Sequence, residues 1–402
     1  MALLLFFASA LSFFDRQVLS VLAPSILADL GMNNVGYSYV VAAFTLSYSV
    51  MFTFGGRMID YLGTRRGMGL TVAFWSLASL LHAGAASALH LGALRFLLGA
   101  GEGGCFPGAA KGVAEEFPPR ERALGMGIAT TGGSAMGAVL APPAIVWIAA
   151  RAGWRGAFLL TGILGAVWVA AWFALVRAPR ANSAAAASRE TAPGWRSLLR
   201  ARQLWGVVAA RFLFDPVFYF YMFWIPQYLS RERGASLEVI GRLTWIPFLT
   251  LGVSSIFAGA VSGRLLRAGW SLDRTRKTVL AAAAFLTPIS ALSVWAPDAG
   301  YAIALMSVLM FAHGFWMTNY MTLLSDLFPS SAVATVVGLT GTAGGLGGFL
   351  SNLAIGRVVE NAGFKPAFVA CGAVYPLALA ILLATVRRVE RIDLLCDRGP
   401  AR

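Results

Sequence analysis

Long apolar segments constrain this chain more than any other feature of its sequence. About twelve of them, each of roughly 20 residues, account for most of the length, and the chain has 402 residues in all. Charged residues make up only 12% of the sequence, whereas soluble domains contain about 25%. An apolar helix of this length spans the hydrocarbon core of a bilayer. The sequence therefore predicts an all-α membrane protein that crosses the bilayer many times.

The expected transmembrane helices follow one another with short arginine-containing loops between them. They cover about residues 2–28, 36–54, 68–86, 89–115, 121–150, 155–177, 205–229, 238–266, 277–296, 300–325, 333–358 and 366–388. Basic residues gather in alternate loops, and such loops face the cytoplasm. An even number of helices and this bias predict a multi-pass protein of the cell (inner) membrane with both termini in the cytoplasm.

An internal repeat divides the chain into two similar halves. Residues 56–66 follow the second expected helix, and a degenerate copy, residues 262–277, follows the eighth. We predict an N-terminal six-helix half over residues 1–178, a cytoplasmic linker over 179–203, a C-terminal six-helix half over 204–390 and a cytoplasmic tail over 391–402. Two such halves would hold a substrate site between them, near the middle of the membrane.

The net charge of +14 does not indicate nucleic-acid binding, because the arginines lie in the short loops where membrane topology places them. Glycine clusters fall inside apolar helices and lack the strand–turn–helix setting of a nucleotide site. No zinc motif or Ser/His/Asp signature is evident. We therefore expect neither an enzyme nor a metal or organic cofactor; protons would serve as the coupling ion.

Residues 95–119 carry charges where lipid-compatible side chains are expected. Arg95, Gly99, Glu102 and Phe106 would share one face of a helix. An ionised side chain at bilayer depth costs roughly 2.5–3.5 kcal/mol, so such a charge faces the interior of the bundle and meets a partner or a ligand. This face is our first candidate for the functional site.

The loop after the second expected helix carries the pattern Gly56-x-x-x-Asp60-x-x-Gly63-x-Arg65-Arg66. It resembles the loop 2–3 signature of the major facilitator superfamily. The glycines permit a tight turn, Asp60 can accept hydrogen bonds from a helix N-terminus, and the arginines anchor the loop at the inner surface. We interpret it as a gating latch for the outward-open state; the alternative is a merely basic loop.

Further segments narrow the resemblance. FDRQVLSVLAPSI at residues 14–26, RFLLGAGEGGCFPGAAKGVAEEF at 95–117 and ARFLFDPVFYFYMFWIPQYL at 210–229 are similar to the anion:cation symporter family. Within that family they resemble the branch that imports hexuronates, galactonate and related sugar acids. The likeness implies the major facilitator fold: twelve transmembrane helices in two pseudo-symmetric halves.

The resemblance also implies roles for four charged residues. Arg16 matches the arginine that binds the substrate carboxylate, a task that suits its planar fork. Asp15 and Glu102 match the two carboxylates linked to proton coupling. Arg95 matches the arginine that pairs with them, and it is also a candidate substrate contact. The alternative is a structural network in which these charges merely neutralise one another.

Two polar contacts follow from the same resemblance. Tyr48 matches a substrate-contacting tyrosine, and Asn352 matches a polar contact in the eleventh helix. The fifth helix departs from the pattern, because Gly133 and Ser134 stand where galactonate carriers have a glutamine. Close mimicry of galactonate recognition is therefore not expected.

Other candidates come from the residues alone. Arg211 and Asp215 stand one helical turn apart and can pair, either as a structural pair or with a gating role. Tyr219 would line the sugar path or pack in the core.

A polar stripe on the tenth helix adds His313, Trp316 and Asn319, at three-residue steps. Their donors, acceptors and aromatic face suit a sugar ring.

These observations predict a transporter that imports an organic anion, a hexuronate or related sugar acid, together with protons by alternating access. Its partners would be the small anion and the lipid bilayer, with no nucleic acid, and the protein would be a monomer. The alternatives are a transporter of another carboxylate, sodium-coupled or an exchanger, and a transport-inactive anion sensor.

Overall fold

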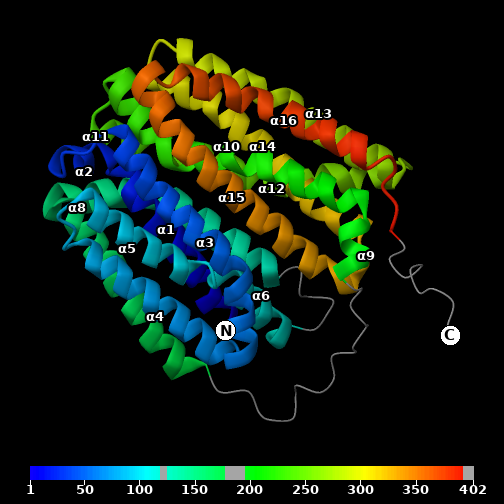
Figure 1. Cartoon of the computed structure of the whole chain (residues 1–402), viewed down its shortest axis with the longest axis horizontal. Helices are drawn as coiled ribbons and strands as arrows, with labels where there is room; N and C mark the ends of the chain where they lie inside the picture. Colours follow the sequence, from blue (N-terminus) through cyan, green and yellow to red (C-terminus); the bar gives the residue numbers. More distant parts are fainter. Residues whose placement is uncertain (118–124, 177–194, 393–402) are drawn as a thin grey trace.

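The computed structural model describes residues 1–117, 125–176 and 195–392, and nearly all of these residues are helical (Figure 1). The helices of the first part are α1 (Ala2–Val21), α2 (Ala23–Asp29), α3 (Asn34–Leu62), α4 (Thr64–His82), α5 (Ala88–Glu102), α6 (Cys105–Glu116), the π-helix η1 (Gly127–Gly132) and α8 (Gly133–Leu175).

The second part begins with the short helix α9, which falls within the last residues of the predicted linker. Its helices are α9 (Trp195–Arg200), α10 (Arg202–Arg233), α11 (Leu237–Leu243), α12 (Trp245–Arg267), α13 (Leu272–Leu286), the 3₁₀ helix η2 (Thr287–Trp295), α14 (Ala299–Leu327), α15 (Ser330–Ala362) and α16 (Lys365–Thr385).

Eight helices of the described residues are long and apolar enough to cross a membrane. One of them, Gly127–Leu175, contains two of the expected helices, which meet at Gly153 with a φ of 67°. Three further expected helices correspond to α4, to α5 with α6, and to α15. The prediction of an all-α protein with twelve membrane-spanning segments is therefore confirmed.

Side-chain caps fix where several helices begin. In each case the cap accepts a hydrogen bond from a backbone N–H of the first turn, which stabilises the helix by about 1 kcal/mol. The caps are Asn33, Ser87, Ser236, Ser271 and Asp298. All five stand in loops between apolar segments, so local sequence and hydropathy agree on the helix boundaries.

Two expected boundaries are wrong. The segment after the second expected helix is largely helical, because α3 continues to Leu62 and only Gly63, with a φ of 77°, separates it from α4. The fourth expected helix is instead broken at Gly103 and Gly104. A side chain on Gly103 would overlap Met51 and the carbonyl of Tyr48 on α3. Close backbone packing at glycines explains the break.

The helices form two bundles (Figure 1). The first bundle contains α1–α6, η1 and α8, and the second contains α10–α16 with η2; they meet where α3 packs along α15, where α1 touches α10, and where α8 packs on α11 and α12. Glycines permit the close approach, since Gly345 and Gly356 of α15 lie directly against Ser49 and Ser38 of α3.

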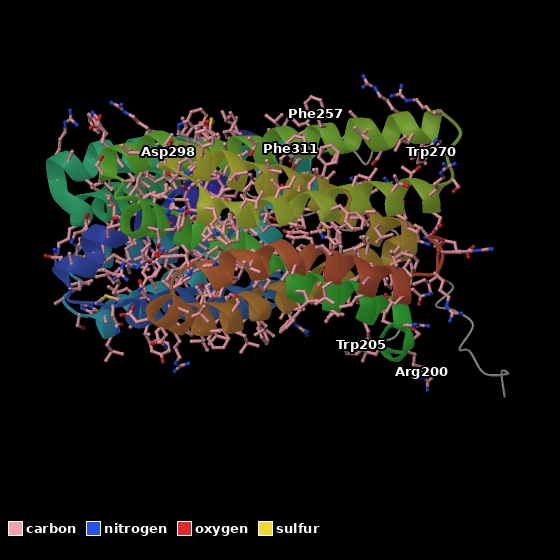
Figure 2. The ribbon with its side chains drawn as sticks, turned by 90° about the horizontal axis from the view of Figure 1, so that it is seen from above. Arg200, Trp205, Phe257, Trp270, Asp298 and Phe311 are labelled. Atoms are coloured by element: carbon pink, nitrogen blue, oxygen red, sulfur yellow. The ribbon has the colours of Figure 1, made fainter. Side chains whose placement is uncertain are left out.

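Loops alternate between two ends of the molecule, which we call the linker end and the far end. The linker end carries α9 and the loop at Trp270, and the far end carries the loop at Asp298; Figure 2 shows these residues at opposite ends. At the far end, Asn34 of α3 donates to Glu360 of α15, through its backbone at 3.3 Å and its side chain at 2.5 Å. Gln227 of α10 donates to the Asn34 side chain.

The helices α8 and α12 separate toward the linker end. Near the far end Gly241 lies against Pro142 and Val146, while Gly259 and Gly263 of α12 have open space around them. The contact between α8 and α12 is thus made toward the far end. The bundles also touch between α3 and α15 nearer the linker end, where the Thr53 and Thr342 hydroxyls lie 2.7 Å apart.

Candidate functional site

The charges of the first and fourth expected helices meet inside the first bundle. Arg16 Nε of α1 donates to Glu102 Oε2 of α5 at 2.7 Å, and the two side chains are 6% and 0% exposed. Ser12 Oγ donates to the same oxygen at 2.9 Å, and Arg16 Nη2 donates to Ser12 Oγ at 3.3 Å. Ser12 and Arg16 are one helical turn apart, so one face of α1 presents both to the carboxylate. These charges face the interior and not lipid.

Aromatic rings surround the Arg16 guanidinium. Its Cζ atom lies 4.3 Å from the ring centre of Tyr48, 4.9 Å from that of Phe13 and 5.5 Å from that of Phe44. A desolvated cation in this position gains about 2 kcal/mol per favourable ring. Nη1 of Arg16 makes no hydrogen bond with the described residues, and it is not among the fully buried atoms that lack a partner, so it remains accessible. The guanidinium is therefore held on one edge and available on another.

Asp15 points to another part of the same bundle. Its Oδ1 atom accepts a hydrogen bond from Ser79 Oγ of α4 at 3.0 Å, and Ser79 lies 2.8 Å from the Thr161 hydroxyl of α8. Asp15 is fully buried, and its Oδ2 atom has no partner among the described residues. A buried carboxylate that is only half satisfied is a natural site for a proton.

Arg95 lies close to both carboxylates without touching either. It is fully buried, and none of its three nitrogens hydrogen-bonds to a described residue. Its guanidinium lies over the Phe158 ring at 5.3 Å and interacts electrostatically with Glu102 and Asp15. The expected direct pair is therefore absent in this conformation. Arg16 and Ser12 hold one oxygen of Glu102, and Ser79 holds one oxygen of Asp15. The second oxygen of each carboxylate has no partner among the described residues, and Arg95 lies against the Phe158 ring instead.

The second bundle contributes Tyr219 of α10. This side chain is 7% exposed and lies in the neighbourhood of Arg16 and Tyr48 of the first bundle. Its ring stacks on Phe223 at 6.2 Å, and Phe223 meets Phe44 edge-on at 6.1 Å. The structure thus brings the candidates Tyr48 and Tyr219 to Arg16 from opposite sides of the bundle interface.

A second contact between the bundles lies where proline interrupts α10. Pro226 has no N–H, so the carbonyl of Met222 lacks its helical donor. Ser20 Oγ of α1 donates to that carbonyl at 2.7 Å. Tyr37 Oη of α3 donates to the neighbouring carbonyl of Phe223 at 2.6 Å. Hydroxyls of the first bundle therefore satisfy backbone groups of the second.

The expected pair on α10 is present. Arg211 Nε donates to Asp215 Oδ2 at 3.0 Å, and Arg211 Nη1 donates to Thr340 Oγ1 of α15 at 3.3 Å. Gly344 of α15 lies directly against the Asp215 carboxylate. The pair ties α10 to α15 within the second bundle, which fits both a structural and a gating role.

The stripe on α14 is buried in the second bundle. His313 Nδ1 lies 2.5 Å from Tyr375 Oη, and Asn319 Oδ1 accepts from Ser262 Oγ at 2.6 Å. Trp316 is fully buried, and its Nε1 atom has no partner among the described residues. These contacts join α14 to its own bundle, and the structure does not bring the stripe to Arg16. Its role as a sugar contact stays a prediction.

Asn352 is also occupied by its own bundle. Its Oδ1 atom accepts from Trp224 Nε1 at 3.0 Å, and its Nδ2 atom donates to the Gly348 carbonyl at 2.8 Å. Trp224 in turn packs edge-on against Tyr37 at 5.1 Å. Asn352 therefore orients an aromatic ring at the contact between the bundles.

The glycine–arginine motif lies at the linker end. Arg65 donates to the last carbonyls of α8, with Nε 2.5 Å from the Val176 oxygen and Nη2 2.8 Å from the Phe173 oxygen. A cation at a helix C-terminus is favourable, so Arg65 anchors α4 to α8. Arg66 is exposed. The side chain of Asp60 lies outside the described residues, and the latch role of the motif stays a prediction.

Some residues of the site are not predicted from the sequence. Ser12 could have been predicted, because it precedes Arg16 by one helical turn and therefore lies on the same face of the helix. Ser79, Phe158 and Tyr37 could not, since they are ordinary residues of apolar helices that only tertiary packing brings to the charges.

The chain is similar to known membrane transporters. The family model of the Major Facilitator Superfamily matches residues 5–352. The hexuronate transporter of Escherichia coli (strain K12) is 30% identical over 397 residues, covering 94% of this chain and 91% of the relative. The D-galactonate transporter of Escherichia coli O6:H1 is 28% identical over 413 residues, with 96% and 95% covered.

A solved structure supports the same fold. The inward open conformation of the xylose transporter XylE from E. coli superposes with a TM-score of 0.77 at 16% sequence identity, covering 96% of this chain and 95% of that one.

Proposed function

Because the chain belongs to the Major Facilitator Superfamily, we propose that this multi-pass membrane transporter imports a hexuronate or a related sugar acid together with protons. The relatives at about 30% identity over nearly the full length carry sugar acids by name, and this supports the substrate class. The superfamily consists of transporters and not enzymes, so the chemistry to account for is binding, proton exchange and conformational change.

The observation that carries the proposal is the buried Arg16–Glu102 pair. Arg16 is fixed at Nε by Glu102 and keeps Nη1 available, so a substrate carboxylate can approach the outer edge of the guanidinium. A charge-assisted hydrogen bond of this kind is short and strong. The rings of Tyr48 and Phe44 keep the cation in place while it changes partners.

Proton coupling follows from competition for one cation. When Glu102 is ionised, it holds Arg16 and reduces the positive charge that a substrate anion meets. When Glu102 takes up a proton, the full charge of Arg16 becomes available to the substrate carboxylate. Asp15, with one free oxygen, would be a second proton site. Substrate and proton therefore favour each other's binding, as symport requires.

Sugar recognition requires groups from both bundles. Tyr48 and Tyr219 approach Arg16 from opposite sides, and their rings and hydroxyls suit a pyranose ring with its hydroxyl groups. Closure of both tyrosines around a bound sugar would link occupancy of the site to the relative position of the bundles.

Transport would proceed by rocking of the two bundles. In the present conformation Asn34 joins the bundles at the far end, and α12 has open space around Gly259 and Gly263 toward the linker end. We assign the linker end to the cytoplasm on the basis of its arginines, and we therefore interpret this conformation as inward-facing. The opposite conformation must break the far-end contacts of Asn34 with Glu360 and Gln227.

Uptake by purified protein in proteoliposomes tests the proposal. We expect glucuronate or galacturonate to accumulate under an inward proton gradient, with no requirement for sodium, and a protonophore to abolish accumulation. Glu102→Gln should lose accumulation but retain exchange of internal for external substrate. Arg16→Lys should lose both, because an ammonium lacks the planar fork.

Glu116→Gln is a matched control. Glu116 is a partly exposed carboxylate whose partner is the chain's amino terminus, 3.2 Å away. It should accumulate substrate like the wild type. Accumulation by the Glu102→Gln variant, or accumulation driven by sodium, would contradict the proposed coupling.

A further inference from the structure

Arg95 and His82 form an unexplained pair of buried polar groups in the first bundle. Arg95 carries only hydrogen-bond donors, and none of its three nitrogens has a partner among the described residues. His82 is fully buried at the end of α4, and its Nε2 atom likewise meets no partner in the described part of the chain. The proposed transport cycle gives His82 no role so far.

The histidine is fixed in one tautomer by its own helix. His82 Nδ1 lies 2.6 Å from the carbonyl oxygen of Ala78. A carbonyl oxygen can only accept, so Nδ1 carries the hydrogen. In the neutral ring Nε2 therefore has a free lone pair and acts as an acceptor.

The donor and the acceptor lie against the same aromatic ring. The His82 ring stacks on Phe158 with 4.7 Å between centres and 23° between planes, and the Arg95 guanidinium lies over the same ring at 5.3 Å. Arg95 is also among the charged groups close to His82. The shared ring places the guanidinium and the imidazole in one part of the bundle, and the long, flexible stem of Arg95 allows its guanidinium to change partners there.

The other acceptors around Arg95 are the coupling carboxylates. Asp15 Oδ2 and Glu102 Oε1 are both buried without a partner in the part of the chain that the structure describes. Tyr37 is the remaining titratable group near Arg95, and His90 is the remaining one near His82. Arg95 thus has two carboxylates and one neutral acceptor among its neighbours.

We propose that His82 is a positioning residue that holds Arg95 by a hydrogen bond to Nε2 when Asp15 and Glu102 are protonated. Arg95 then alternates between two sets of acceptors during the transport cycle. With ionised carboxylates it turns toward them; with neutral carboxylates it returns to His82 and Phe158. The neutral acceptor keeps the cation from staying with the carboxylates and opposing their protonation. This inference rests on the proposed proton coupling.

Three substitutions separate the hydrogen bond from the shape of the side chain. His82→Gln places an amide oxygen near the Nε2 position, whereas the shorter His82→Asn reaches only the Nδ1 position. His82→Phe keeps an aromatic ring against Phe158 but has no acceptor. His90→Gln is the control, because His90 is exposed at the far end.

The readout is the pH at which proton-driven glucuronate uptake into proteoliposomes is half-maximal, together with substrate exchange without a proton gradient. We expect His82→Asn and His82→Phe to move this pH lower by roughly one unit, because Arg95 then stays with the carboxylates and favours their ionised forms. Exchange should persist in both. His82→Gln and His90→Gln should match the wild type.

An unmoved half-maximal pH in His82→Asn, or an equal shift in His82→Gln, would overturn the inference while leaving proton coupling intact. If His82→Phe fails to fold, the comparison of Gln with Asn still decides. Uptake by the wild type that does not depend on pH would instead overturn the proposed function, and this inference with it.

Discussion

Ser20→Ala removes a hydroxyl that joins the two bundles and also lies beside Tyr37 of its own bundle. Ser20 Oγ of α1 donates at 2.7 Å to the Met222 carbonyl of α10. Pro226 has already deprived that carbonyl of its helical donor, and Ser20 is 1% exposed. Without the hydroxyl, the buried carbonyl has no donor in the conformation seen here.

The magnitude follows from the burial of the carbonyl. A buried polar group left without a partner costs about 1–3 kcal/mol. In the opposite conformation the bundles separate at this point and water can reach the carbonyl, so the cost falls on one conformation only. The equilibrium should therefore shift toward the outward-facing conformation by roughly 5- to 150-fold.

Double electron–electron resonance measures this shift directly. Spin labels at Leu89 and Ala362, both exposed at the far end, report the separation of the bundles once the three native cysteines have been replaced. Ser20→Ala should increase the population at long distance. Tyr37→Phe, which removes the hydroxyl 2.6 Å from the Phe223 carbonyl, should act in the same direction.

Thr287→Ala is the matched control. It also removes a buried hydroxyl that donates to a carbonyl, that of Gly372 at 3.2 Å, but both residues belong to the second bundle. It should lower thermal stability without changing the distances. Distance distributions of Ser20→Ala and Tyr37→Phe identical to that of the wild type would refute the role of these hydroxyls in holding the far end closed.

Two further predictions concern packing and pH. Gly344→Ala should destabilise the protein and impair transport, because a Cβ there would overlap the Asp215 carboxylate. Gly338→Ala on the same helix is the control: a Cβ there meets nothing within 4 Å, so the change should be neutral or stabilising by up to about 1 kcal/mol. Thermal unfolding in detergent measures both effects. Hydrogen bonds from Arg155 and a neighbouring tryptophan lower the pKa of the exposed Asp29 below its ordinary value of 3.8. A lowered pKa contributes stability that is present above the ordinary value and is lost as the pH falls through the value of the folded protein. Arg155→Ala should therefore lower the unfolding temperature at pH 5. The difference in unfolding temperature from the wild type should be smaller near pH 3.

The sequence predicted the fold and the central charges for one physical reason. Hydrocarbon penalises both a broken helix and a bare charge, so long apolar segments and the rare charges inside them carry information that does not depend on tertiary packing. Arg16 and Glu102 stand out on that ground alone, and the structure joins them directly. The same logic found Arg211 and Asp215, whose spacing along one helix suffices to predict their pairing.

What the sequence could not supply is the choice among neighbours. The sequence predicts that Arg95 pairs with the carboxylates. In the structure Glu102 binds Arg16 instead, because Ser12 binds the same carboxylate oxygen and α1 directs Arg16 toward it. His313 was expected to face a sugar, yet Tyr375, which lies 62 residues away, occupies its Nδ1 atom. Hydropathy is equally high on either side of a helix in a bundle, so it cannot distinguish a residue facing the interface from one facing its own bundle.

The positions at which helices break were also not predicted correctly from the sequence. The glycines at 103 and 104 break α5 from α6 because α3 requires close contact there, whereas the glycines at 55 and 56 remain helical within α3. Two pairs of adjacent glycines thus differ in conformation, because the contact with the neighbouring helix determines whether the helix continues or breaks.

Proton uptake on substrate binding tests the central claim most directly, because it needs neither a membrane nor a gradient. Purified protein in a weakly buffered solution near neutral pH is mixed with glucuronate while the pH is recorded. If the substrate carboxylate and ionised Glu102 compete for Arg16, binding should draw protons from solution, and Glu102→Gln should bind glucuronate with less proton uptake. Binding with no proton uptake by the wild type, or equal uptake by the wild type and Glu102→Gln, would contradict the account.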